Sequence, residues 1–166
     1  MSRNEQTGLA DDFPPVLPGA GASDYERYLR TDELLSLQKM PEERAHHDEL
    51  LFQCTHQASE LWLKLAGEEL ELATTHLRAG EIAPALRLLR RSILCFRLVT
   101  QALDMLELMS PWEYTSDIRP VLGHGSGFDS PGWSRIRHAA PELGEAFHGL
   151  RREAGLTLAD VYIQGR

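Results

Sequence analysis

The sequence predicts an all-α fold, and three observations support this prediction. Apolar residues recur three, four or seven positions apart over long stretches of the 166-residue chain. No segment alternates apolar and polar residues over a useful length, as a half-buried strand would. Clusters of proline and glycine divide the chain into segments of helical length. We therefore expect long antiparallel helices in a bundle, with a glycine-rich loop and short C-terminal helices.

Residues 1–22 are expected to form a flexible N-terminal arm, because they are rich in proline and glycine and show little periodicity. Residues 23–166 form the predicted helical domain. It begins with short helical pieces after Asp24. Pro41 is then expected to open the next helix, because proline suits the first helical turn.

Two long helices form the predicted centre of this domain. Residues 44–78 contain neither proline nor a turn cluster and predict one amphipathic helix, with Gly80 as its C-cap. Residues 82–110 repeat the pattern, and the short joint between the two helices predicts an antiparallel hairpin. Cys54 and Cys95 fall inside these helices, so we expect two small buried apolar residues and no disulfide.

The chain after Pro111 is expected to form a loop, because prolines and glycines crowd residues 120–132. Beyond this loop, residues 133–138 and 141–153 give two weaker helical patterns. Residues 156–163 predict one short helix.

Composition disfavours several classes of function. The net charge is −8, whereas a nucleic-acid-binding face needs clustered basic residues, so no nucleic-acid partner is expected. No apolar run approaches the length of a membrane span, and the first 22 residues lack the features of a signal peptide. We therefore expect a cytoplasmic protein with no membrane partner.

Phe52 and His56 form the first candidate site. They are four residues apart on one predicted helix and therefore project from the same face. This spacing places an imidazole beside an aromatic ring. A core histidine hydrogen-bonded across a bundle gives the same pattern, so the two residues alone leave both interpretations open.

The second candidate site combines Tyr114 and Arg119 with the glycine-rich residues 123–127. A guanidinium can donate two parallel hydrogen bonds to a carboxylate, and a glycine-rich backbone lets N–H groups approach an anion closely. Both features suit the carboxylate of an amino acid. A flexible turn would have the same composition, and no nucleotide-binding motif is present.

A third interpretation is a di-metal site. Glu43–His46 and Glu145–His148 both have the Glu-x-x-His spacing that di-iron bundles use on two of their helices. This spacing occurs readily by chance in a chain with 7 histidines, so the motif is weak.

Three stretches of the chain resemble the tryptophan 2,3-dioxygenase family of heme enzymes. They are YERYLRTDELLSLQ from residue 25, HHDELLF…HQASELWLKL from residue 46 and SPWEY…R…LGHGSGF from residue 110. The stretches occur in the family's order and cover about residues 24–130. The resemblance implies a heme b cofactor and oxidation of L-tryptophan by dioxygen to N-formyl-L-kynurenine.

The resemblance also implies roles for the matching residues. His56 would be the catalytic distal histidine near the indole N–H, and Phe52 would pack on the ring. Tyr114 and Arg119 would bind the substrate carboxylate. Heme would be contacted by Phe52, His56, Ser126 and Gly127. In this family a neighbouring subunit supplies the substrate-binding residues that match Tyr25 and Tyr28, so a homotetramer is implied.

The chain departs from the family pattern in three places. The spacing from Tyr114 to Arg119 is one residue longer than usual, and His124 and Gly125 replace smaller or more typical residues. The part of the family that carries the proximal heme histidine is expected to be absent, so the iron ligand is not identified. Two alternatives therefore stay open: an inactive, truncated relative that acts as a binding or oligomerisation module, and a heme enzyme for another indole or aromatic substrate.

Overall fold

The structure is a computed structural model that describes residues 14–164, and its regular elements in that range are all helical. The predicted all-α class is confirmed. The chain divides into two compact units, the first ending at Arg44 and the second beginning at Ala45. The predicted domain boundary after residue 22 stays a prediction, and residues 1–13 of the predicted arm lie outside the described residues.

The first unit contains α1 (Asp24–Leu29), α2 (Thr31–Leu34) and the 3₁₀ turn η1 (Pro41–Glu43). Ser23 and Glu26 cap the start of α1 reciprocally, each side chain accepting a hydrogen bond from the other's backbone N–H. The Asp24 carboxylate accepts hydrogen bonds from the N–H groups of Val16 and Leu17, which lower its pKa. The segment before α1 is therefore hydrogen-bonded to that helix.

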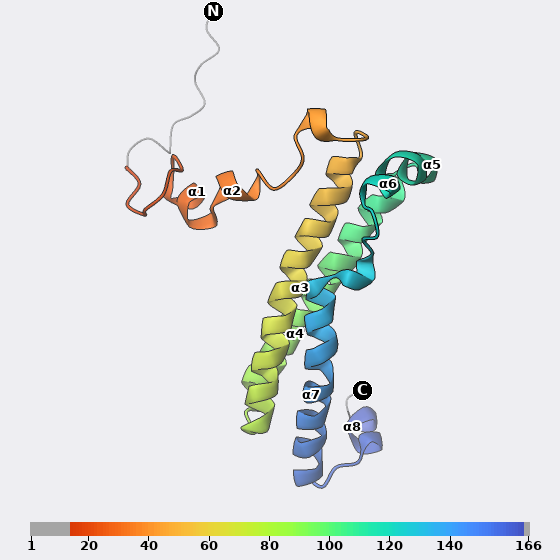
Figure 1. Ribbon diagram of the computed structural model, residues 1–166. Coiled ribbons are helices and arrows are strands. Elements are labelled where there is room, and N and C mark those ends of the chain that lie inside the picture. The colour runs from red at the N-terminus through yellow and green to blue at the C-terminus, as the bar shows by residue number, and fades with distance from the viewer. Residues whose placement is uncertain (1–13, 165–166) are drawn as a thin grey trace, which may run out of the picture. The chain divides into compact units, whose positions relative to one another are not determined.

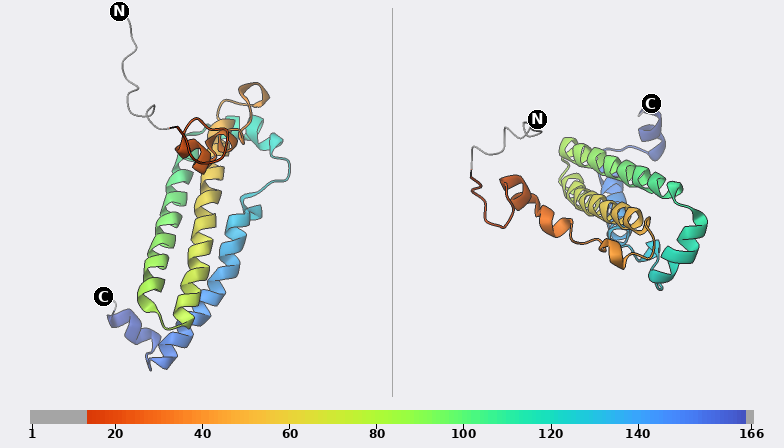
Figure 2. Two further views of the ribbon diagram at one scale, coloured as in Figure 1. Left: turned by 90° about the vertical axis from the view of Figure 1, so that its left-hand side faces the viewer. Right: turned by 90° about the horizontal axis from the view of Figure 1, so that it is seen from above.

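The second unit is built on three long helices that run side by side, α3 (Glu49–Arg78), α4 (Ile82–Asp104) and α7 (Pro131–Glu153) (Figures 1 and 2). Successive helices run in opposite directions, so the predicted α3–α4 hairpin is confirmed. Gly80 makes the turn between them with a φ of +73°, a value that glycine adopts without steric cost.

The core of this bundle lies where α3 faces both of its neighbours. Apolar residues from all three helices are buried there: Leu63, Ala66, Leu70, Cys95, Val99, Ile136 and Ala139. A β-carbon on Gly132 would lie 2.5 Å from the β-carbon of Leu63, so a glycine is required for the first turn of α7 to approach α3 this closely. Burying each large apolar side chain contributes about 1.5–3 kcal/mol.

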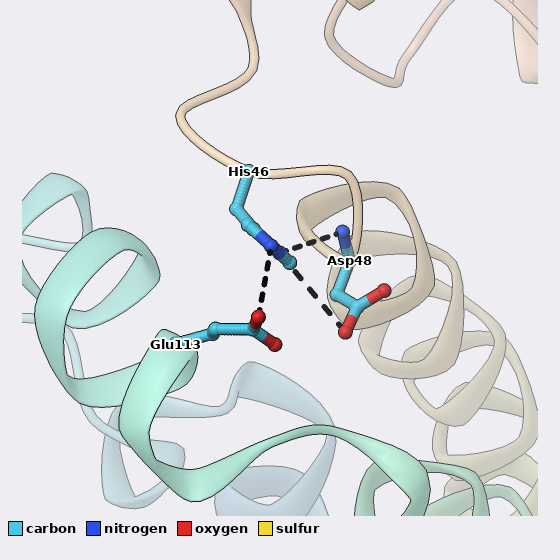
Figure 3. A group of neighbouring side chains, drawn as sticks. All are labelled: His46, Asp48 and Glu113. Carbon is cyan, nitrogen blue, oxygen red and sulfur yellow. Dashed lines mark hydrogen bonds and ion pairs between the residues drawn. The ribbon is translucent and has the colours of Figure 1, made fainter.

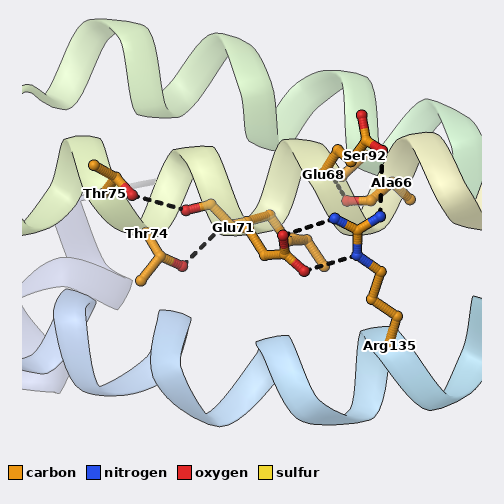
Figure 4. A network of polar contacts seen from close by, with 8 residues as sticks. Ala66, Glu68, Glu71, Thr74, Thr75, Ser92 and Arg135 are labelled. Atoms are coloured by element: carbon orange, nitrogen blue, oxygen red, sulfur yellow. Dashed lines mark hydrogen bonds and ion pairs between the residues drawn. The ribbon is translucent and has the colours of Figure 1, made fainter.

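Polar contacts connect α3 to the other two helices (Figure 4). The Arg135 guanidinium on α7 donates to both carboxylate oxygens of Glu71, each at 2.7 Å, and to Glu68 at 3.3 Å. Hydrogen bonding to Arg135 lowers the pKa of Glu71. On the other side, the Ser92 hydroxyl of α4 donates to the Ala66 carbonyl at 3.2 Å.

Helix α3 begins at Glu49, whereas the sequence predicted one helix over residues 44–78. Arg44 is extended, and the Glu49 carboxylate accepts a hydrogen bond from the Ala45 N–H at 2.7 Å. This contact holds the residues before the helix in a turn. Cys95 is buried as predicted, but Cys54 is exposed, because its side chain lies on the solvent face of α3.

Helix α7 is continuous through Pro141, whereas the sequence predicted two separate segments. Proline removes one backbone donor and disfavours the helix interior. Both halves of α7 nevertheless pack on the bundle, through Ile136 and Ala139 before the proline and through Ala146 after it. The predicted C-terminal helix is present as α8 (Leu158–Gln164). None of the described helices is long and apolar enough to span a bilayer.

Candidate functional site

An open cleft of about 700 Å³ lies in the second unit, between the start of α3 and the segments that follow α4. These segments are the 3₁₀ turn η2 (Met105–Leu108), α5 (Pro111–Glu113), the π-helix η3 (Tyr114–Ile118), α6 (Arg119–Val121) and the 3₁₀ turn η4 (Gly127–Asp129). Six residues predicted from the sequence line the cleft: Phe52, His56, Tyr114, Arg119, Ser126 and Gly127. Six others complete the lining: Leu106, Glu107, Met109, Pro111, Leu122 and Gly125.

His56 is held in one tautomer by the backbone of its own helix. Its Nδ1 lies 2.8 Å from the carbonyl oxygen of Phe52, and a carbonyl can only accept a hydrogen bond. Nδ1 therefore carries the proton of the neutral ring, and Nε2 keeps a free lone pair. His56 thus offers the cleft a hydrogen-bond acceptor.

The aromatic part of the cleft is formed by three rings from two segments. Phe52 lies 4.1 Å from the His56 ring and 5.9 Å from the Tyr114 ring, measured between centroids. The three residues are half-buried, so part of each ring is open to a ligand. Such a surface suits a flat aromatic group, with polar atoms available at its edges.

The π-helix accounts for the spacing between Tyr114 and Arg119. The Arg119 N–H donates to the Tyr114 carbonyl, five residues back, where an α-helix would make this bond four residues back. Residues five apart therefore share one side of the helix, and both line the cleft. The fully buried side chain of Ile118 anchors this turn.

Arg119 is exposed at the cleft and keeps most of its donors free. Its Nη1 donates to the Gly123 carbonyl at 2.8 Å, which fixes the side chain against the loop. It forms no ion pair with any other residue of the described range. The remaining guanidinium N–H groups can therefore bind an anion.

Glu60, which the sequence analysis did not single out, fixes the end of the glycine-rich loop. Its carboxylate accepts hydrogen bonds from the Ser130 hydroxyl and, at 2.9 Å, from the Gly132 N–H. These bonds hold the start of α7 against α3, one turn beyond His56. The available sequence signal was its position four residues after His56 on the same helical face.

His46, Asp48 and Glu113 form a polar cluster beside this region (Figure 3). The His46 Nδ1 accepts a hydrogen bond from the Asp48 N–H at 3.1 Å, so the neutral ring carries its proton on Nε2, which faces Glu113 at 3.8 Å. Neither nitrogen then offers a free lone pair to a metal ion shared with the carboxylates. We interpret the cluster as a contact that holds α5 against the residues before α3.

The predicted di-metal site receives no support from the described part of the chain. The group of three neighbouring metal-binding side chains found there includes His46 but none of Glu43, Glu145 and His148. Glu43 instead caps η1 in the first unit.

Tyr25 and Tyr28 belong to the first unit, whereas the cleft lies in the second. They lie on α1, and the two residues are 69% and 77% exposed. Their predicted contribution to the site of a neighbouring subunit stays a prediction.

A comparison with protein-family models matches residues 16–145 to the tryptophan 2,3-dioxygenase model. This range includes every residue that lines the cleft.

Curated relatives with the name tryptophan 2,3-dioxygenase match part of the chain. The protein of Xanthomonas campestris pv. campestris (strain B100) is 46% identical over 110 residues, which are 66% of this chain and 37% of the relative. The protein of Pseudomonas aeruginosa (strain UCBPP-PA14) is 38% identical over 132 residues, which are 78% of this chain and 44% of the relative. The matched part of the chain thus spans less than half the length of these relatives.

Proposed function

Because the chain belongs to the tryptophan 2,3-dioxygenase family, we propose that it oxidises L-tryptophan with dioxygen to N-formyl-L-kynurenine. One observation carries the proposal. Side chains from three separate parts of the sequence, around residues 52–56, 114–119 and 126–127, meet in a single cleft of suitable size.

The residues of the cleft suit the parts of L-tryptophan. The free Nε2 of His56 would accept the indole N–H, while the Phe52 ring packs on the indole. Arg119 would bind the carboxylate through its remaining N–H groups, with the Tyr114 hydroxyl as a further donor. Binding at both ends would orient the indole for reaction.

The cleft residues fit one face of a heme. Leu106, Met109 and Leu122 give the cleft an apolar part, and we propose that Ser126 and Gly127 contact the ring system. The oxygen chemistry would be supplied by heme when it is bound. His56 is the one imidazole that lines the cleft in the described part of the chain, and we assign it to the substrate. A ligand for the iron would then be a residue that does not line this cleft.

We also propose that the protein assembles as a homotetramer in the cytoplasm. Exposed apolar side chains on α3, among them Leu61, Leu65 and Leu72, would be covered by such an assembly. Tyr25 and Tyr28 would then reach the cleft of a neighbouring subunit. The thiols of Cys54 and Cys95 are both free, which suits a reducing compartment. Light scattering of the purified chain gives its mass in solution and tests the assembly.

The product assay tests the proposed activity. The purified chain is loaded with hemin and reduced to the ferrous state with ascorbate. Its Soret band is recorded, and the absorbance of N-formyl-L-kynurenine is followed after L-tryptophan and dioxygen are added. We expect product from the loaded protein and none from the heme-free protein. A loaded protein that binds L-tryptophan but forms no product would contradict the proposed activity and support the non-catalytic binding module.

A further inference from the structure

We propose that a groove between α4, α7 and α8 binds a straight-chain fatty acid, with the acyl chain along α7 and the carboxylate at Arg151. The groove has a volume of about 530 Å³ and lies in the second unit. The described residues that line it all differ from those that line the cleft. One of them, Leu77, is about 30 Å along α3 from His56. This second site is therefore independent of the proposed function.

The surface of the groove is almost wholly apolar. Its lining combines side chains of α4, α7 and α8, among them Ile82, Leu86, Leu143, Leu150 and Val161. Ile82 and Leu86 are 59% and 45% exposed, so water covers part of this apolar surface. Covering the surface with hydrocarbon would release that water and favour binding. The volume is in the range of small-molecule sites.

The groove follows α7 for about three turns. The lining residues of this helix include Ala140 and Arg151, which are about 16 Å apart along the helix axis. The lining side chains are mostly aliphatic, with the ring of Phe147 among them. An extended aliphatic chain suits such a surface better than a planar ligand does.

Gly144 lines the middle of the groove. It lies in the interior of α7, where glycine is less favourable than alanine. A β-carbon on Gly144 would meet no atom of a neighbouring segment within 4 Å, so close packing in the described structure does not require a glycine here. Gly132 differs, because its β-carbon would lie 2.5 Å from Leu63. A large side chain at position 144 has room to extend into the groove.

Arg151 supplies the charge of the groove and has an unpaired donor. It is the one charged residue among the described residues of the lining. Its guanidinium donates from Nη1 to the Leu156 carbonyl, whereas its Nε is buried with no acceptor in the described part of the chain. A buried donor without a partner is unfavourable, and a carboxylate is a stronger acceptor than a neutral group. An anionic head group at this end of the groove would supply the missing acceptor, which a purely apolar ligand cannot do.

Calorimetry on the full chain, with and without hemin, tests this assignment. The probes are decanoate below its micelle concentration, 1-decanol, which keeps the chain without the charge, and acetate, which keeps the carboxylate without the chain. Arg151→Gln removes the charge, and Gly144→Leu fills the groove. Arg152→Gln is the matched control, because Arg152 is an exposed arginine of the same helical turn that does not line the groove.

We expect decanoate to bind more tightly than 1-decanol, and acetate not to bind measurably. Arg151→Gln should weaken decanoate about tenfold and leave 1-decanol unchanged. Gly144→Leu should weaken both ligands about tenfold or more, because it occupies the space of the chain. Arg152→Gln should change neither by more than about twofold.

A wild-type chain that does not bind decanoate would overturn the proposal, and so would wild-type affinity for decanoate in Arg151→Gln. Urea unfolding shows whether Gly144→Leu is folded. A folded Gly144→Leu that binds decanoate normally would also overturn the proposal, and Arg151→Gln decides the case if that variant does not fold. Self-association that Gly144→Leu abolishes and decanoate does not weaken would assign the groove to a second copy of the chain instead.

Discussion

His56 has its proton on Nδ1, where the Phe52 carbonyl accepts it at 2.8 Å, and this leaves Nε2 to accept from a ligand. The contact is between residues of one helical turn, so it exists before any ligand binds. The Nε2 of His56 can therefore accept a hydrogen bond from an N–H group of a ligand.

This orientation predicts how His56→Ala changes selectivity. The variant should lose most of the preference for L-tryptophan over 1-methyl-L-tryptophan, which has no indole N–H. A neutral hydrogen bond contributes about 0.5–1.5 kcal/mol, so the ratio of the two Kd values should fall roughly two- to tenfold. His138→Ala is the matched control, because His138 makes the same Nδ1–carbonyl contact, with Ser134, outside the cleft. An unchanged ratio in His56→Ala would contradict the assignment.

Arg119 carries the second prediction at the residue scale. Replacing it with alanine removes a charged hydrogen-bond donor, so binding of L-tryptophan should weaken by about 1.5–3 kcal/mol, with hemin binding unchanged. Calorimetry with the amino acid and a hemin titration measure the two effects separately. Arg137→Ala serves as the control, because Arg137 is exposed on α7 and does not line the cleft. Wild-type affinity for L-tryptophan in Arg119→Ala would remove Arg119 from this role.

Six residues that the sequence predicted as site residues line one cleft in the structure. Their individual roles stay predictions. Phe52 and His56 could be paired from helical spacing alone. Glu107 could not, because its position depends on where α4 changes to a 3₁₀ turn, and helix ends are set by packing more than by local pattern. Glu60 was missed because its partners, Ser130 and Gly132, are about seventy residues away.

At the scale of elements, the π-helix η3 determines which way Arg119 points. The turn contains one more residue than an α-helical turn would need, and the Arg119 N–H closes it on the Tyr114 carbonyl. Extra residues of this kind are commonly accommodated as π-bulges at functional sites. The π-helix therefore accommodates the one residue by which the Tyr114–Arg119 spacing exceeds the family pattern.

Deleting Thr115 tests this interpretation. The shortened segment should form an ordinary α-helix, in which the side chains that are now five positions apart become four positions apart and still share one face. We expect binding of L-tryptophan close to that of the wild type, with unchanged helical content by circular dichroism. Thr115→Ala keeps the residue count and loses only the hydroxyl contact with the Pro111 carbonyl, so it should also bind normally. A deletion variant that binds as weakly as Arg119→Ala would show that the extra residue is needed to place Arg119 at the cleft.

The contact of Arg135 with Glu71 and Glu68 predicts a pH dependence of stability. The pKa of Glu71 is lower in the folded protein than in the unfolded chain, so its contribution is present at neutral pH. This contribution should begin to disappear below about pH 4.3 and be lost as the pH falls through the folded-state value. Both partners are largely solvated, so we expect at most about 1 kcal/mol.

Urea unfolding of the wild type and Glu71→Gln at pH 7 and pH 3 measures this difference. The variant should be less stable at pH 7, and the difference in unfolding free energy should be smaller at pH 3. A gap that is equal at both pH values would show that the carboxylate charge does not contribute.

Periodicity predicted helices over residues 44–78 and 82–110, whereas α3 spans Glu49–Arg78 and α4 spans Ile82–Asp104. Before α3, the chain forms a turn in which the Glu49 carboxylate accepts a hydrogen bond from the Ala45 N–H. The continuity of α7 through Pro141 depends on packing against α3, which a local rule for proline ignores. Periodicity does not describe these side-chain contacts.

At the scale of the whole molecule, the second unit places the cleft between the start of α3, one of three bundled helices, and the short segments that follow α4. The matched part of the chain spans 37% of the Xanthomonas campestris relative and 44% of the Pseudomonas aeruginosa relative.

The most direct test of the central claim is the origin of the oxygen atoms in the product. The hemin-loaded chain is reduced to the ferrous state with ascorbate and supplied with L-tryptophan and ¹⁸O₂, and the product is analysed by mass spectrometry immediately after a short reaction. We predict N-formyl-L-kynurenine that contains both labelled oxygen atoms. A product with one labelled atom, or no oxidised product from a chain that binds both heme and L-tryptophan, would contradict dioxygenase activity.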